Sequence, residues 1–310
     1  MRINIIREAE SLGDWEMTPR IIRQVENNLI EFLAKDGCQL HGSLVSKKNK
    51  KAVIFIPGMG GNFYRSIGLR MYKKFINGGF DLFLLNTRGH DTIAKVIFEK
   101  TRNKNRRVKF LGTGLEKFEE SFYDIKAAVD LLDKLRYKKT VLMGHSSGCH
   151  KAIYYQYKAN DKRILALVLL APSDDYNLEI KRLGNKWVNI VKKTKKLIKK
   201  KKGDTIILPE EYFSAQRFDS ISNLNRVESR LFNYDKNLKE FSMIRKPILV
   251  IFGSKDKGLT KSAAEHLKIL KSRTSSKKFD GLIVKNADHG FKDYEDKIAN
   301  KIISWLRRIK

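Results

Sequence analysis

One short motif, Gly144-His145-Ser146-Ser147-Gly148, follows directly after an apolar run over residues 140–143 and constrains the fold more than any other feature. The apolar run predicts a buried strand, and residues 152–157 have a helical pattern. A sharp turn between a strand and a helix brings two backbones close together, which favours glycine two positions before and after its central residue. We therefore predict a strand–turn–helix unit that holds the Ser146 hydroxyl outward on a strained backbone.

Strand and helix patterns alternate along most of the chain. Residues 66–76, 118–135 and 298–309 carry apolar side chains at helical spacing, and short apolar runs between such segments predict strands. This alternation predicts the α/β class, with a largely parallel sheet covered by helices on both faces. The expected strands are residues 28–33, 39–45, 52–56, 81–85, 140–143, 164–170, 247–252 and 282–284, of which the first two form a hairpin.

The alternation breaks between residues 173 and 244, which have helical character but belong to neither neighbouring strand. A long insertion inside a regular α/β pattern favours a cap or lid over a bare loop. We therefore predict three parts. These are an N-terminal extension over residues 1–27, a core made of residues 28–172 and 245–310, and a cap over residues 173–244.

Composition narrows the class of protein. The chain has 310 residues, of which 42% are hydrophobic, so it can bury a substantial core. It has no run long enough to cross a bilayer, no signal-peptide pattern and only two cysteines, so we expect a cytoplasmic protein without a disulfide framework. The net charge of +30 comes mainly from lysines, which outnumber arginines by more than two to one, and no nucleic-acid-binding motif accompanies it. Nucleic acid is therefore not an expected partner.

Two residues further along the chain suggest, together with Ser146, a catalytic site. A serine hydroxyl becomes an effective nucleophile only beside a base that a carboxylate orients. Asp256 stands in the turn Gly253-Ser254-Lys255-Asp256 after one predicted strand, and His289 stands in Asp288-His289-Gly290 after another. Since Ser146, Asp256 and His289 each follow a strand, we predict them as nucleophile, orienting acid and base.

Two backbone N–H groups are expected to bind the negative oxygen that forms during attack on a carbonyl. One belongs to Ser147, and the other to Met59 in the loop Pro57-Gly58-Met59-Gly60-Gly61. This loop lacks the Gly-Lys-Ser/Thr ending of a phosphate-binding loop. No cofactor is expected, and no histidine or cysteine spacing predicts a metal site.

Neighbouring residues are alternatives for these roles. The glycines flank Ser147 less symmetrically than Ser146, and Asp174 or Asp175, which follow another predicted strand, could supply the acid. His90 is a less suitable base, because it precedes Ser146, whereas the expected order along the chain is nucleophile, acid and then base. The histidines near the site in sequence are His90, His145 and His150.

Over roughly residues 28–309 the chain resembles the α/β-hydrolase superfamily. The motifs that carry the resemblance are residues 57–61, Asn86-Thr87-Arg88-Gly89-His90, and residues 144–148, 253–256 and 288–290. It implies a mostly parallel eight-stranded sheet flanked by helices, and hydrolysis of an ester, amide or thioester. Many members have His-Gly where this chain has Pro57-Gly58, a departure that leaves the backbone donor in place. The stretch 213–218 and the context of Ser146 are more weakly similar to a group that includes fungal siderophore esterases.

Residues 180–202 contain eleven lysines or arginines and no acid. We interpret this stretch as a lid helix whose apolar face covers the site while its lysines are solvated. Attachment to an anionic membrane surface and attraction of anionic substrates are alternatives. The residues expected on the apolar face are Leu183, Trp187, Ile190, Val191, Thr194 and Ile198.

The function that follows is hydrolysis of a small carboxylic ester through an acyl-enzyme on Ser146. A lipase-like peripheral membrane enzyme, an acyltransferase and a non-catalytic binding protein on the same fold are the alternatives. The acyl group, the leaving group and the oligomeric state have no signature in the sequence.

Overall fold

The computed structural model describes residues 21–24, 28–99 and 106–309, so the expected N-terminal extension lies outside the described residues except for 21–24. Within these ranges the main sheet has nine strands in the order β1-β2-β3-β5-β4-β8-β9-β12-β13. All but β1 match the eight expected strands, and β1 adds a strand at one edge. The strands are β1 (Ile21–Gln24), β2 (Leu29–Leu33), β3 (Gln39–Val45), β4 (Lys51–Ile56), β5 (Asp81–Asn86), β8 (Lys139–His145), β9 (Ile164–Leu170), β12 (Ile248–Gly253) and β13 (Phe279–Val284).

The sheet is parallel from β5 through β4, β8, β9 and β12 to β13, and antiparallel from β1 to β5. Successive side chains of a strand point to opposite faces, so a fully buried strand feeds two cores. In β4, Ile54 belongs to the core on one face, whereas Val53 and Phe55 belong to the core on the other. This explains why the central strands are continuously apolar.

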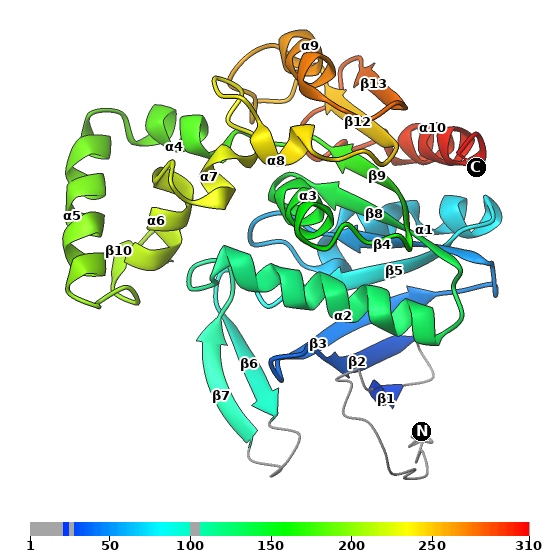
Figure 1. Cartoon of the computed structure of the whole chain (residues 1–310), viewed down its shortest axis with the longest axis horizontal. Coiled ribbons are helices and arrows are strands. Elements are labelled where there is room, and N and C mark those ends of the chain that lie inside the picture. The colour runs from blue at the N-terminus through cyan, green and yellow to red at the C-terminus, as the bar shows by residue number, and fades with distance from the viewer. Residues whose placement is uncertain (1–20, 25–27, 100–105, 310) are drawn as a thin grey trace.

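Helices cover both faces of this sheet (Figure 1). On one face, α1 (Ile67–Asn77) and α10 (Glu295–Arg307) contribute Met71 and Ile302 to the core. On the other, α2 (Ser121–Lys134), α3 (Ser147–Ala159) and α9 (Ala263–Arg273) contribute Ile125, Ile153 and Leu270. Two short 3-10 turns, η1 (Phe63–Arg65) and η2 (Phe118–Glu120), precede α1 and α2. The result is the three-layer α/β architecture that the alternating pattern predicts.

Residues 173–244, called the insertion below, lie between β9 and β12 and have an apolar cluster of their own. Figure 1 shows α4, α5 and α6 projecting beyond the sheet at one end of the molecule. The basic stretch expected as one helix instead spans two helices, because Gly184 between them adopts a positive φ of 50°. The elements of the insertion are α4 (Asp175–Leu183), η3 (Gly184–Lys186), α5 (Trp187–Lys199), β10 (Ile206–Leu208), β11 (Phe213–Ser214), α6 (Ala215–Ser222), α7 (Val227–Leu231) and α8 (Lys239–Ser242).

The sequence did not predict a second segment that lies outside the main sheet. β6 (Ala94–Glu99) and β7 (Arg106–Leu111) form an antiparallel hairpin outside the main sheet. Phe98 on β6 bridges to Cys38, which attaches one strand of the hairpin to the body of the protein, while β7 is largely exposed. Among the helices of the described residues, none combines the length and apolar character needed to cross a membrane.

Candidate active site

Ser146 stands at the turn between β8 and α3 with φ of 53° and ψ of −127°, a conformation that is strained for any residue with a side chain. A Cβ atom on Gly144 would lie 2.5 Å from the Gly148 carbonyl oxygen, and one on Gly148 would lie 2.2 Å from the Ile56 carbonyl oxygen. Both glycines are therefore required by backbone contact. The structure has the sharp strand–turn–helix unit expected from the motif.

Asp256 and His289 meet at the carboxyl ends of β12 and β13. His289 Nδ1 lies 3.0 Å from each carboxylate oxygen of Asp256, whose side chain is fully buried. Burial of the imidazole disfavours its charged form, but the hydrogen bond and the charge of Asp256 outweigh burial and raise the pKa of His289 above its ordinary value. The geometry gives His289 a fixed orientation and a strengthened basicity.

His145, the residue before the serine, connects the two halves of the site. Its Nε2–H donates a hydrogen bond of 2.8 Å to the backbone carbonyl of His289, and the two rings lie 5.1 Å apart. Burial, together with the nearby His289, lowers the pKa of His145 to about 4, so the ring is neutral at neutral pH. No hydrogen bond joins Ser146 Oγ to His289 within the described residues. Such contacts are often long in ligand-free sites and shorten when substrate binds.

The expected oxyanion loop lies directly against Ser146. A Cβ atom on Gly58 would be 2.9 Å from Ser146 Cβ, and Gly60 N–H donates to Thr113 Oγ1 at 2.7 Å. Ser147 begins α3, where backbone N–H groups have no partner within the helix. In the part of the chain that the structure describes, the backbone N–H groups of Met59 and Ser147 donate no hydrogen bond to another residue. Both groups are free to bind an oxygen.

The alternative acids have other contacts. Asp174 caps α4 and accepts hydrogen bonds from the backbone N–H groups of Asn177 and Tyr234. Asp175 accepts a hydrogen bond from Ser173 and lies 3.7 Å from His150. The carboxylate in contact with His289 is that of Asp256.

His90 lies in the loop after β5, where its Nδ1 is 2.8 Å from the Thr87 carbonyl oxygen. Because a carbonyl oxygen can only accept, this ring nitrogen carries the proton. Asp91, the next residue, accepts hydrogen bonds from Asn62 and Tyr64. His90 is thus held away from the Asp256–His289 pair by its own local contacts.

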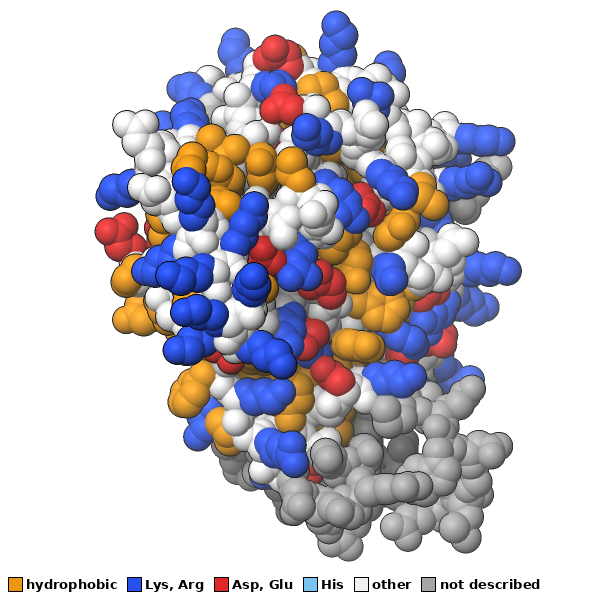
Figure 2. Space-filling view, turned by 60° about the vertical axis from the view of Figure 1, so that its left-hand side comes forward, with side chains coloured by type: hydrophobic (Ala, Val, Ile, Leu, Met, Phe, Trp, Pro, Cys, Tyr) orange, Lys and Arg blue, Asp and Glu red, His pale blue; other side chains and the backbone are white. Residues whose placement is uncertain are grey.

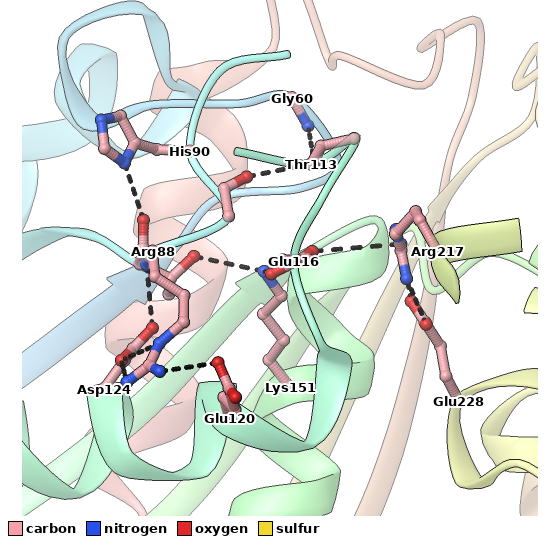
Figure 3. Close-up of polar contacts among 12 residues, drawn as sticks. Gly60, Arg88, His90, Thr113, Glu116, Glu120, Asp124, Lys151, Arg217 and Glu228 are labelled. Atoms are coloured by element: carbon pink, nitrogen blue, oxygen red, sulfur yellow. Dashed lines mark hydrogen bonds and ion pairs between the residues drawn. The ribbon is translucent and has the colours of Figure 1, made fainter. Parts of the chain in front are cut away.

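Buried charged residues connect the core to the insertion (Figure 3). Lys151 Nζ, on α3, lies 2.8 Å from Glu116 Oε2 and 3.2 Å from Thr87 Oγ1. The other oxygen of Glu116 lies 4.0 Å from Arg217 Nη2 of the insertion, and Arg217 also pairs with Glu228 at 2.8 Å. The sequence did not predict this series of buried ion pairs, because the paired residues are far apart in sequence and charged side chains are usually exposed.

A second buried arginine anchors the motif that begins at Asn86. Arg88 donates to Asp124, Asp36 and Glu120, and its side chain is fully buried (Figure 3). These bonds fix the loop after β5 to α2. Arg88 therefore has a structural role near the loop of residues 57–61, since Thr113 bonds both Gly60 of that loop and Gly89.

The insertion reaches the site through Met59. This side chain packs against the insertion's apolar cluster, to which α5 contributes Trp187, Ile190, Val191 and Ile198. The apolar face of the basic stretch, which we expected to cover the site, packs into the insertion's own cluster, and Leu183 of this face belongs to α4. A separate surface hollow of about 500 Å³ lies beside Gln156, Met243 and Arg245, and none of the candidate catalytic residues lines it.

Within residues 21–24, 28–99 and 106–309, no three His, Cys, Asp or Glu side chains are grouped so that they could hold a metal ion. The strand order, the serine turn after β8 and the acid and histidine after β12 and β13 define the α/β-hydrolase fold. The chain belongs to the family described as "Protein of unknown function (DUF1749)", whose model matches residues 105–307.

Solved structures have the same fold at low sequence identity. A monoacylglycerol lipase from Paleococcus ferrophilus is 18% identical with a TM-score of 0.58, over 87% of this chain and 99% of that one. Est1E from Butyrivibrio proteoclasticus, solved with ferulic acid, is 15% identical with a TM-score of 0.58, over 88% and 96%. The siderophore hydrolase EstB from Aspergillus fumigatus is 16% identical with a TM-score of 0.63, over 87% and 95%. No curated protein sequence matches this chain.

Proposed function

We propose that this protein is a serine hydrolase that cleaves carboxylic esters. The observation that carries the proposal is the contact between buried Asp256 and partly exposed His289, whose backbone accepts a hydrogen bond from His145 of the turn that bears Ser146. An oriented imidazole of raised pKa, linked through His145 to a serine on a strained turn, supports nucleophilic catalysis at an acyl carbon.

In the proposed reaction, His289 Nε2 takes the proton of Ser146 as Oγ attacks the ester carbonyl. The backbone N–H groups of Met59 and Ser147 donate hydrogen bonds to the resulting oxyanion. The imidazolium, held by Asp256, then protonates the leaving alkoxide as the C–O bond breaks. Water attacks the acyl-enzyme with His289 again as base, which releases the acid and restores Ser146.

The substrate class rests on similarity and on the site's surroundings. Proteins of this fold that are similar in structure include a monoacylglycerol lipase and esterases. We further propose that residues 173–244 act as the cap of the site, since Met59 packs against their apolar cluster. An apolar wall beside the oxyanion loop would favour an acyl group with a hydrocarbon chain.

The test is labelling with a fluorophosphonate probe, together with hydrolysis of short- and long-chain p-nitrophenyl esters. Wild-type protein is expected to be labelled, and Ser146→Ala to lose labelling and fall in kcat by up to about 10⁶-fold. Ser147→Ala is the matched variant for the position of the nucleophile. It keeps its backbone N–H group and is expected to remain labelled.

Circular dichroism of Ser146→Ala is the control for folding. Full activity of folded Ser146→Ala would refute the assignment of the nucleophile. An unlabelled wild-type protein would instead favour a binding protein, and formation of a new ester in the presence of an added alcohol would favour an acyltransferase.

A further inference from the structure

Eight lysines gather on the outer side of α5 and the turn after it. All eight are exposed, and within the described residues none of them forms an ion pair. They are Lys192, Lys193, Lys195, Lys196, Lys199, Lys200, Lys201 and Lys202, called the lysine face below. Since the apolar side of α5 is already packed in the insertion, the lysine face has no partner within the described part of the protein.

Exposed apolar side chains occur near the lysine face. Val188, in the first turn of α5, is 56% exposed, and Tyr212 of the insertion is 54% exposed. On the hairpin strand β7, Val108 is 50% and Phe110 is 65% exposed. In the β6–β7 register, Ile97 is paired with Val108 and Lys95 with Phe110, so one side of the hairpin is both apolar and basic.

In Figure 1 the hairpin and α5 both lie toward the left-hand side of the view, with α5 above and the hairpin below. After β7 the chain reaches Gly114, whose carbonyl accepts a hydrogen bond of 3.0 Å from Ser214 N–H of the insertion. Ser214 leads into α6, and Phe218 of α6 packs in the same apolar cluster as Trp187 of α5. Figure 2, which brings this side forward, shows basic side chains interspersed with hydrophobic ones.

We propose that this side of the protein binds the surface of an anionic lipid bilayer. The lysine face would be attracted to lipid phosphates, and Phe110 with Tyr212 would enter the interfacial region. Basic residues and exposed aromatic side chains together are what peripheral binding requires, because charge brings the protein to the surface and apolar contact holds it there. The proposal rests on this surface alone and does not depend on the proposed function.

Nucleic acid is the other large polyanion, and the surface suits it less well. The lysine face contains no arginine, the residue whose planar guanidinium grips phosphate in two places. A bilayer presents a diffuse negative surface to which lysine point charges are adequate. The exposed aliphatic residues Val108 and Val188 have no counterpart in a phosphate backbone.

The test is cosedimentation of the full chain with vesicles of phosphatidylcholine, with and without phosphatidylglycerol. Binding is expected only with the anionic lipid and should weaken as salt is added. The combined substitution of Lys192, Lys195, Lys196 and Lys199 by Gln should weaken it by about 100-fold or more, since each lysine near such a surface contributes about fivefold. Phe110→Ser should reduce the binding that persists at high salt.

A matched variant replaces Lys268, Lys271, Lys277 and Lys278 by Gln. These exposed lysines lie on or after α9, which Figure 1 shows at the top of the view, away from both α5 and the hairpin, and their loss changes the net charge equally. It is expected to keep vesicle binding. An equal loss in both quadruple variants, or no binding to anionic vesicles, would overturn the proposal.

Inorganic tripolyphosphate and a duplex RNA serve as competitors. Displacement by the RNA at concentrations below those of accessible lipid would overturn the proposal in favour of nucleic acid, whereas persistence of the complex supports it. Hydrolysis of p-nitrophenyl acetate without vesicles should be equal in all variants. If no variant hydrolyses the ester, the proposed function fails while the binding result stands.

Discussion

At Ser146 the proposed nucleophile stands on a strained backbone. Its φ of 53° is maintained by the strand and helix on either side, so the folded structure bears the cost of presenting the hydroxyl. Ser146→Ala keeps a Cβ atom and therefore the strain, whereas Ser146→Gly relieves it. We predict that Ser146→Gly is more stable than Ser146→Ala by about 1 kcal/mol in urea unfolding. Equal stability would mean that the turn is not strained.

The pH dependence of activity follows from the Asp256–His289 pair. The proposed catalysis needs neutral His289, whose pKa is raised by the hydrogen bond and charge of Asp256, so kcat/KM should fall as pH drops through a value above the ordinary imidazole pKa. In Asp256→Asn the effect of burial, which lowers the pKa of His289, is opposed only by the smaller effects of the Asp175 and Asp288 charges. The acid limb should therefore move to lower pH while kcat falls by about four orders of magnitude. A limb that stays in place would exclude Asp256 as the partner that raises this pKa.

The raised pKa of His289 also makes stability depend on pH, in the direction opposite to activity. A group whose pKa is raised on folding stabilises the folded state below its unfolded pKa, and this contribution is lost as pH rises through the folded pKa. The Asp256–His289 pair is thus most stabilising in mild acid, where the proposed activity is expected to be lowest. Activity and local stability are therefore expected to have different pH optima.

At the scale of elements, buried Arg217 of the insertion lies 4.0 Å from Glu116 of the core and forms an ion pair with Glu228 inside the insertion. Glu228 is fully buried. Burial alone would raise its pKa, but the charge of Arg217 lowers it below the ordinary value. Removing one partner of such a pair leaves an uncompensated buried charge. We predict that Glu228→Gln lowers the free energy of unfolding by about 3 kcal/mol or more and accelerates proteolysis within the insertion.

The control for that prediction is Asp296→Asn, which removes the exposed partner of Lys74. An exposed pair contributes less than about 1 kcal/mol, so this variant should unfold nearly as the wild type does. If the buried pair did not stabilise the insertion, Glu228→Gln and Asp296→Asn would have the same free energy of unfolding and the same rate of proteolysis. The pH series gives a second readout, because the stabilisation from Glu228 should disappear as pH falls through its lowered pKa.

Local sequence signals predicted the core elements but not those whose basis is long-range. The run at β4 and the spacing in α10 are patterns within one segment, and the structure has both within three residues of the expected bounds. The β6–β7 hairpin mixes basic and apolar residues on both of its sides, so neither strand alternates clearly. The helix α9 was missed although Ser262 and Glu265 form a capping box, a signal that could have found its start.

The candidate site divides in the same way. The order of Ser146, Asp256 and His289 is legible in the chain, and the contact between the last two follows from the topology. The hydrogen bond from His145 to the His289 carbonyl could not be predicted from the sequence, because it joins a side chain to a backbone group 144 residues away. Glu116 likewise finds Lys151 and Arg217 only in the folded protein.

At the scale of the whole molecule, a net charge of +30 makes the folded state repel itself. Salt screens exposed charges but acts weakly on the buried pairs of Arg88, Lys151 and Arg217. Added salt should therefore remove more repulsion than attraction. We predict that raising sodium chloride from about 0.01 to 0.1 M, which shortens the screening length from about 30 to 10 Å, raises the urea midpoint without changing the m-value.

Glucose at equal osmolality is the control for that salt effect, and it should raise the midpoint less. The Lys192, Lys195, Lys196 and Lys199 quadruple Gln variant carries a smaller net charge, so its midpoint should be higher at low salt and respond less to added salt. A midpoint that falls with salt would mean that exposed ion pairs stabilise the fold more than the excess lysines destabilise it. The lysine face would then cost little stability, and its charge would need no compensating partner.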